Sequence, residues 1–390
     1  MSSYRLGPGI LVTAAFIGPG TLTVCTVAGA SYGLELLWAV FLSILLTAFL
    51  QTLVARLSWN SGMGLVELVH YHSPNRSFRL VVLTAIVAAI GLGNTAYEAG
   101  NITGALLGLK VFLPVAYTRV AHYPALIFIG LALAFFLWVG NPQWIKKLML
   151  GVVVLMSISF LVTAFWVGPS LVPLFKALLV PRVPQGSLFT IMAVVGTTMV
   201  PYNLFLHAAL SKDKQQFGSQ TALRNDSLMA IGLGGLISMA VVVAASVAPA
   251  AAIRNAADLA QALTPLFGEA ARYLVGLGLF AAGFSSALTA PLAAAFVVQE
   301  SMGWPADAPK TKAVPLFVLI FGLAALSLEF TPTLLIQFAQ WANALLLPFI
   351  ILFLAYLVWR IQRPPWLTAV LFIVFCVFLV LSGKTLWGLL

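Results

Sequence analysis

The chain has 390 residues, of which 62% are hydrophobic and only 8% are charged. A soluble domain carries roughly 25% charged residues, so this composition excludes an ordinary soluble protein. Apolar runs of about 20 residues recur along the chain, which predicts an all-α membrane protein with many spanning helices. The net charge of +10 also occurs in nucleic-acid-binding proteins, but basic loops in a membrane protein set its orientation.

About eleven candidate spans follow one another, separated by short loops. They lie near residues 8–30, 35–57, 80–107, 122–140, 147–167, 188–210, 227–248, 270–297, 314–330, 334–358 and 366–388. With the N-terminus placed inside, most of the 20 Lys and Arg fall on the inner side. This bias predicts a multi-pass protein with its N-terminus inside and its C-terminus outside. We expect the membrane to be the cytoplasmic (inner) membrane of a bacterium. The expected partners are therefore the lipid bilayer and a small-molecule or ion substrate, with no nucleic acid.

Several function classes lose support from what the sequence lacks. Cys25 and Cys376 lie in apolar runs, and no run of Cys and His has the spacing of a resident metal site. The sequence contains no phosphate-binding motif of the form G-x-x-x-x-G-K-[ST]. We expect no cofactor, no resident metal and no enzyme activity, and our working expectation is a monomer.

Two of the spans contain helix-breaking residues in their middle. The first span reads FIGPGT, with Gly18 and Gly20 around a proline and Thr21 after them. The sixth span reads GTTMVPYNLFLH, with Pro201 mid-span and Asn203 two residues later. Proline removes a helical hydrogen bond. Unpaired backbone inside a bilayer is tolerated only where it is buried in protein or lines a cavity.

The two breaks occupy matching places, because each stands in the first of five consecutive spans. Kinks at single prolines are common in membrane helices, but a matched pair indicates a transporter built from two inverted repeats. We predict one transmembrane transporter domain over residues 1–390, with repeat one at about 8–167, repeat two at about 188–358 and an extra helix at about 366–388. The substrate would bind at the midplane, between the half-helix ends.

Four stretches resemble the Nramp family of proton-coupled divalent-metal transporters, and the resemblance covers nearly the whole chain. The first span, with FIGPGT and its continuation into QTLVARLSWNSGMGLVELV, resembles the opening helices of the family. The sixth, VPYNLFLHA, resembles the family motif M-P-H-N-L-Y-L-H. The eighth, LFAAGFSSALTAPL, resembles A-A-G-Q-S-S-T, and the tenth, QFAQWANALLLPF, resembles S-Q-V followed by L-P-F. The resemblance implies a LeuT-like fold in which helices 1 and 6 are broken.

The departures from the family pattern concern the metal ligands. The first-helix motif of the family is D-P-G-N, whose Asp and Asn bind metal, and here Gly18 and Thr21 replace them. In the sixth helix Val200 replaces the metal-binding Met, and Tyr202 replaces the His after the proline. In the eighth helix Phe284 replaces a Gln. A dehydrated transition metal needs anionic or soft ligands, and this set offers neither.

The predicted substrate-binding set is polar and neutral. It comprises Gly18, Gly20, Thr21, Val200, Tyr202, Asn203, Phe284, Gln340 and Asn343. Such a set suits a small organic solute, which is our leading hypothesis for the substrate of this secondary active transporter. The alternative is a divalent metal ion held with its hydration shell, such as Mg²⁺, which dehydrates reluctantly, or Mn²⁺ as in the family.

Two ionisable residues are candidates for proton coupling. Glu98 lies deep in the third span, where an acidic residue is rare and functional by default. The resemblance places it on the acidic residue of the family's third helix, on the proton route. His207 matches the second His of the sixth-helix motif, and an imidazole can exchange a proton near neutral pH. The alternatives are a structural carboxyl bonded to a neighbour such as Asn94 or Asn101, and a packed histidine.

Overall fold

The computed structural model describes residues 17–113, 122–140, 143–212, 214–248, 253, 255–305, 308–326, 331–361 and 365–387. Within these residues every regular element is a helix. The helices are α2 (Pro19–Tyr32), α3 (Leu37–Ser61), α4 (Leu65–His72), α5 (Arg76–Lys110), α6 (His122–Val139), α7 (Gln143–Val167), α8 (Leu171–Leu179), α9 (Leu188–Thr198), α10 (Pro201–Ser211), α11 (Lys214–Phe217), α12 (Gln220–Ala245), α13 (Ala256–Ala260), α14 (Thr264–Phe267), α15 (Ala270–Met302), α16 (Pro309–Ala325), α17 (Pro332–Ile361) and α18 (Pro365–Trp387).

The helices match the predicted spans. Eight segments of the described chain are long and apolar enough to cross a membrane, and one of them runs through α9 and α10. The other three predicted spans correspond to α2, α6 and α16, which are shorter. The all-α membrane prediction is confirmed. The first predicted span is described only from residue 17 onward, so its first half, residues 8–16, lies outside the described residues.

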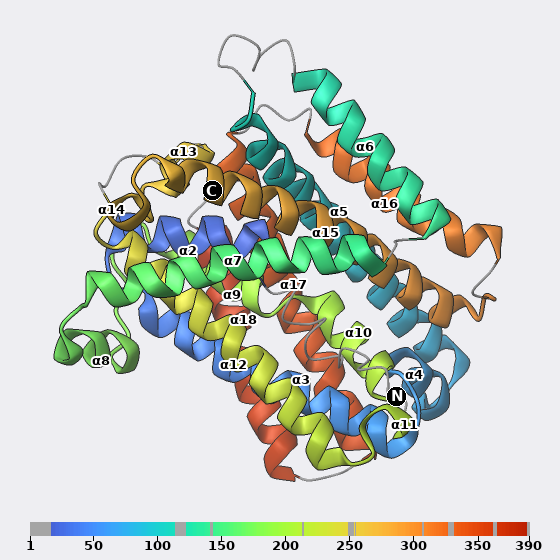
Figure 1. The fold of residues 1–390 in the computed structure, drawn as a ribbon. Helices are drawn as coiled ribbons and strands as arrows, with labels where there is room; N and C mark the ends of the chain where they lie inside the picture. Colours follow the sequence, from blue (N-terminus) through green and yellow to red (C-terminus); the bar gives the residue numbers. More distant parts are fainter. Residues whose placement is uncertain are drawn as a thin grey trace.

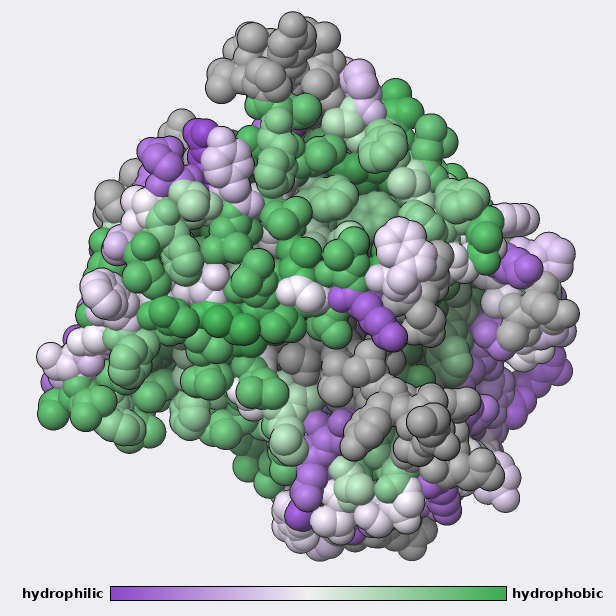
Figure 2. Space-filling model, in the orientation of Figure 1, coloured by the Kyte–Doolittle hydropathy of each residue, from purple (hydrophilic) through white to green (hydrophobic). Residues whose placement is uncertain are grey.

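The outer surface is that of a membrane protein. Large apolar side chains are exposed on α6, α7 and α18, for example Phe128 at 66%, Phe165 at 89% and Ile373 at 62%. Figure 2 shows apolar residues over most of the middle of one face, with the hydrophilic ones gathered mainly toward its margins. In water such a face would be costly, whereas lipid tails solvate it.

The helices pack around a long central pair, α5 and α15, and Figure 1 shows α6 beside α16 along one edge and α3 beside α12. Small residues allow the close approach of the central pair. A methyl group added at Gly283 of α15 would overlap the backbone of α5 at Asn101 and Ala105. Close backbone contact of this kind stabilises helix pairs in membranes, where the hydrophobic effect between helices is weak. The central pair thereby supports the helices that carry the two breaks.

Candidate functional site

The sixth span is broken where the sequence predicts it. Helix α9 ends at Thr198 and α10 begins at Pro201, with Met199 and Val200 outside the helical geometry. Proline fits the first turn of α10 because the N–H that it lacks would have no helical partner there. No side chain caps the start of α10. Because α9 ends here, its last carbonyl oxygens accept no hydrogen bond from a following helical turn. Both half-helix ends are therefore free to face a substrate.

The described half of the first span begins at the matching place. Helix α2 begins at Pro19, and Gly18 precedes it with φ −91° and ψ 178°, an extended conformation. No side chain caps this start either. The hydroxyls of Thr21 on α2 and Thr197 on α9 lie 2.9 Å apart and share a hydrogen bond. This bond joins the first and sixth spans directly.

Gln340 lies where several helices converge. A methyl group added at Gly20 of α2 would stand 2.6 Å from Cδ of Gln340, so the amide packs on the bare backbone of the break. Gly196 of α9 packs against the backbone carbonyl of Gln340, and Gly100 of α5 also lies close to its side chain. Because these glycines have no side chains, α17 can place the amide of Gln340 against α2 of the first span and α9 of the sixth span.

Several polar atoms of α10 and α17 are buried and have no hydrogen-bond partner among the described residues. They are Oδ1 of Asn203, Oε1 of Gln340 and Nδ2 of Asn343. The Tyr202 hydroxyl makes no hydrogen bond of good geometry, and it interacts with Tyr97. Each of these residues is only 1% exposed, as is Thr21. An unpartnered buried polar group costs roughly 1–3 kcal/mol, so such a group indicates a place where a ligand or water binds. That these atoms together form the core of one binding site stays a prediction.

The described part of the site carries no charged side chain among its predicted substrate-binding residues. Within the described ranges no group of three or more His, Cys, Asp and Glu side chains could hold a metal ion. The oxygens available are amide, hydroxyl and backbone carbonyl oxygens, which are hard donors without charge. Oxygens of this kind suit hydrated Mg²⁺ or Ca²⁺ better than a dehydrated transition metal.

The remaining predicted residues fall in different surroundings. Val200 is buried immediately before α10. Phe284 stacks on Phe280, with ring centroids 5.7 Å apart, and meets Phe136 of α6 edge to face at 6.2 Å. It belongs to an apolar cluster formed by α5, α6, α15 and α16. Its recorded contacts are thus with this cluster rather than with the two breaks, and its role in lining the site stays a prediction.

Glu98 is fully buried on α5, where its side chain packs against Gly322 of α16. Neither carboxyl oxygen makes a hydrogen bond of good geometry with a described residue. Asn101, one turn further along α5, interacts with the carboxyl, and Tyr202 lies within its electrostatic range. The rings of Tyr202 and Tyr97 meet edge to face at 5.5 Å. Tyr202 therefore stands between the break and the buried acid.

His207 is buried in α10, two turns beyond the break. Its Nδ1 bonds Oε1 of Gln51 on α3, and its Nε2 lies 3.1 Å from the hydroxyl of Ser227 on α12. Both ring nitrogens are therefore occupied by protein partners. This arrangement fits the packed-histidine alternative as well as a relay, so the proton-coupling role of His207 stays a prediction.

An ion-pair cluster lies just beyond the end of α10. Nζ of Lys212 lies 3.1 Å from Oε1 of Glu67 on α4 and 3.3 Å from Oε1 of Glu300 on α15. Burial lowers the pKa of Lys212, but the two carboxylates more than offset this effect, so the pKa lies above its ordinary value. The cluster links the sixth span to α4 and α15 at the end of the helices.

Three contacts at these sites escaped the analysis of the sequence. Thr197 stands one turn before the break in the stretch GTTMVPYN, so its position was visible but its bond to Thr21 was not. The partners of His207 lie on other helices, Gln51 at a distance of 156 residues and Ser227 at 20 residues along the chain. The only feature of the sequence that could have pointed to Gln51 and Ser227 is a polar side chain within an apolar span.

Comparison with known families matches the arrangement. Residues 9–388 match the family model described as Nramp, "Natural resistance-associated macrophage protein-like". The "Divalent metal cation transporter MntH" of Klebsiella pneumoniae subsp. pneumoniae is 29% identical over 309 residues, which cover 75% of this chain and 71% of that protein. The MntH protein of Deinococcus radiodurans is 29% identical over 317 residues, covering 77% of this chain and 69% of that protein.

Solved structures show the same fold. The Eremococcus coleocola manganese transporter, in complex with an aromatic bis-isothiourea substituted compound, superposes with a TM-score of 0.76 at 18% identity, covering 96% of this chain and 84% of that one. Mhp1 in its inward-facing conformation superposes with a TM-score of 0.58 at 14% identity, covering 91% of this chain and 78% of that one. At these identities the likeness concerns the LeuT-like fold alone.

Proposed function

We propose that this chain, which belongs to the Nramp family of membrane transporters, carries a divalent metal ion across the membrane with part of the ion's water shell in place. Membership of the family makes the chain a secondary transporter rather than an enzyme. The two inverted repeats, at about 8–167 and 188–358, are part of the proposal, as are the N-in, C-out orientation and a bacterial inner membrane.

The substrate class rests on the relatives and on the site together. The curated relatives named above are divalent metal cation transporters. This favours the metal-ion alternative over the small organic solute, which the comparisons do not support. The neutral site then selects among metal ions, because a transition metal stripped of water needs ligands that it lacks. Mg²⁺, which keeps several waters when bound, is the ion that we put first.

The observation that carries the proposal is a pair of buried amide oxygens, Oδ1 of Asn203 and Oε1 of Gln340, that have no partner among the described residues. These oxygens can accept hydrogen bonds from the waters of a hydrated cation. The carbonyls at the end of α9 add the negative end of a half-helix. Thr21 and Thr197, which bond each other in this structure, can separate to supply two further oxygens.

Glu98 is the acid that we assign to coupling. It is buried, it makes no hydrogen bond of good geometry with a described residue, and Tyr202 connects it electrostatically to the break. A carboxyl in such a place can gain and lose a proton as the site changes occupancy, which would link ion movement to a proton gradient. His207 is the second candidate in the same proposal.

Flux into proteoliposomes tests the function. We expect the purified protein to carry Mg²⁺ down its gradient, with Mn²⁺ binding no tighter than the millimolar range, about −4 kcal/mol. The paired variant Asn203→Leu with Gln340→Leu should abolish Mg²⁺ flux, while Gln337→Leu, an α17 control outside the site, should keep it. Flux of an organic solute without any divalent-ion flux would overturn the proposal. So would micromolar Mn²⁺ binding that depends on Thr21 and Asn203.

A further inference from the structure

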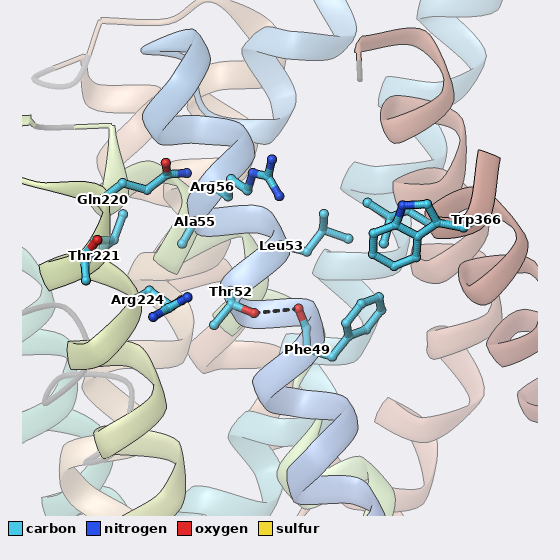
Figure 3. Close-up of a pocket in the computed structure, with 11 residues that line it drawn as sticks. Phe49, Thr52, Leu53, Ala55, Arg56, Gln220, Thr221, Arg224 and Trp366 are labelled. Atoms are coloured by element: carbon cyan, nitrogen blue, oxygen red, sulfur yellow. Dashed lines mark hydrogen bonds between the residues drawn. The ribbon is translucent and has the colours of Figure 1, made fainter. Parts of the chain in front are cut away.

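A groove of about 380 Å³ lies on the outside of α3, between the start of α12 and the start of α18. None of the residues that line it belongs to the candidate transport site. Figure 3 shows α3 in the middle of the groove, with Arg224 of α12 on one side and Trp366 of α18 on the other. Arg56 stands on α3, one turn after Thr52.

The groove is basic. Arg56 and Arg224 come from different helices and are both exposed, and none of the described residues that line the groove is a carboxylate. Among the described residues neither guanidinium takes part in a salt bridge, in contrast to Arg182 and Lys212. Two unpaired guanidinium groups on one cavity repel each other unless an anion lies between them. Arginine binds phosphate oxygens in a fork, and this fork favours phosphate esters over a simple anion.

The other wall of the groove is apolar. Leu53 of α3 and Leu367 of α18 are buried along it, and Phe49 lies one turn before Leu53 on α3. Trp366 is 65% exposed at the start of α18, and exposed tryptophan is enriched at the interface between lipid and water. One ligand that satisfies both walls has a phosphate at one end and hydrocarbon at the other.

The position of the groove agrees with such a ligand. Helix α12 begins at Gln220 and α18 begins at Pro365, so the groove opens where two spans begin and α3 approaches its end at Ser61. This level is that of lipid headgroups. In the orientation predicted from the basic residues it faces the inner leaflet, whose anionic lipids attract Arg and Lys.

We propose that this groove binds an anionic phospholipid, with Arg56 and Arg224 on its phosphate and the acyl chains lying along Phe49, Leu53 and Leu367. The lipid would brace α12 and α18 against α3. A soluble phosphate shares the headgroup chemistry, but it makes no use of the apolar wall or of Trp366. The site is separate from the ion path, because two positive charges would repel a divalent cation.

Binding of fluorescent phosphatidylglycerol to the full-length protein in detergent tests the proposal. Each basic residue near an anionic lipid surface contributes about 1 kcal/mol. The double variant Arg56→Gln, Arg224→Gln should therefore bind about 30-fold more weakly. The matched control is Arg76→Gln with Arg79→Gln, which removes the same charge at the start of α5, outside the groove, and should bind as the parent does. Phosphatidylcholine should bind weakly to all variants.

A competition experiment distinguishes a phospholipid from a soluble phosphate as the ligand of the groove. Inorganic phosphate at millimolar concentration should fail to displace the lipid. If it displaces the lipid, the ligand is a soluble phosphate and the lipid proposal is overturned. Equal lipid binding by the parent and the Arg56, Arg224 double variant also overturns it. Should that variant not fold, Thr221→Glu places a carboxylate on an exposed position of the groove, and it must weaken lipid binding at least tenfold.

Discussion

Replacing Gly20 by Ala tests whether Gln340 must lie on bare backbone for transport. The new Cβ would stand 2.6 Å from Cδ of Gln340, about 1 Å inside an ordinary carbon contact of about 3.5 Å. The amide must therefore move by about 1 Å. Overpacking of this size costs about 1–3 kcal/mol, whereas Ala in place of a helical Gly gains about 1 kcal/mol. We expect a net loss of stability of about 0–2 kcal/mol and a loss of ion uptake of at least tenfold.

The control variant is Gly91→Ala on α5, where an added methyl group meets nothing within 4 Å. It gains helix propensity without a clash, so its midpoint of thermal unfolding should rise while uptake stays unchanged. The double variant Gly20→Ala, Gln340→Ala removes the clash. It should recover the unfolding midpoint of the parent but not its uptake, because the amide oxygen is gone.

Thermal unfolding in detergent and uptake into proteoliposomes measure these effects. The reasoning is refuted if Gly20→Ala unfolds at a higher temperature, as Gly91→Ala does, and also transports at the parental rate. That outcome would show that Gln340 does not rest on the break during transport. Loss of uptake in the Gly91→Ala control would show instead that any change in α5 disturbs the protein.

Three further predictions concern the ion, the proton and the helix ends. The double variant Gly18→Asp, Thr21→Asn restores the family ligands at an extended backbone position that Asp can adopt, and calorimetry should show Mn²⁺ binding at least tenfold tighter than in the parent. Glu98→Gln should abolish uptake driven by a pH gradient and leave ion binding within about tenfold, or about 1.4 kcal/mol; unchanged pH-driven uptake would make Glu98 structural. Lys212→Met leaves the carboxylates of Glu67 and Glu300 without their cation. Its midpoint of thermal unfolding should fall by an amount that corresponds to a loss of about 1–3 kcal/mol in stability. The control variant Lys214→Met should unfold as the parent does.

Much of the fold was predictable because the bilayer imposes strong rules on sequence. A span must be long and apolar, and any break in it must be buried in protein or line a cavity. Those rules locate the break at Pro201 and the start of α2 at Pro19, and the structure confirms both. The same reasoning predicts that Thr21 and Asn203 share one site, because paired breaks meet at the middle of an inverted repeat.

The packing of single side chains was not predictable in this way. Whether Phe284 faces the breaks or the cluster on α6 depends on the rotation of α15, and Gly283 sets this rotation by its close contact with α5. The bond between Gln51 and His207 spans more than a hundred residues. Nothing local in either segment encodes such a pair. Contacts of this type follow from the tertiary arrangement rather than from hydrophobic pattern.

The substrate was the step at which the residues alone left two hypotheses open, and the comparisons favour the alternative over the leading one. Loss of the carboxylate at Gly18 and of the thioether at Val200 made a small organic solute the leading hypothesis, because a divalent ion without water needs anionic or soft ligands. A divalent ion held with its hydration shell was the alternative. An ion that keeps its waters needs acceptors for their hydrogens, and the unpartnered oxygens of Asn203 and Gln340 are acceptors of this kind. In the proposed mechanism these amide oxygens select the ion by its hydration, and Glu98, which interacts electrostatically with Tyr202 of α10, ties its passage to a proton.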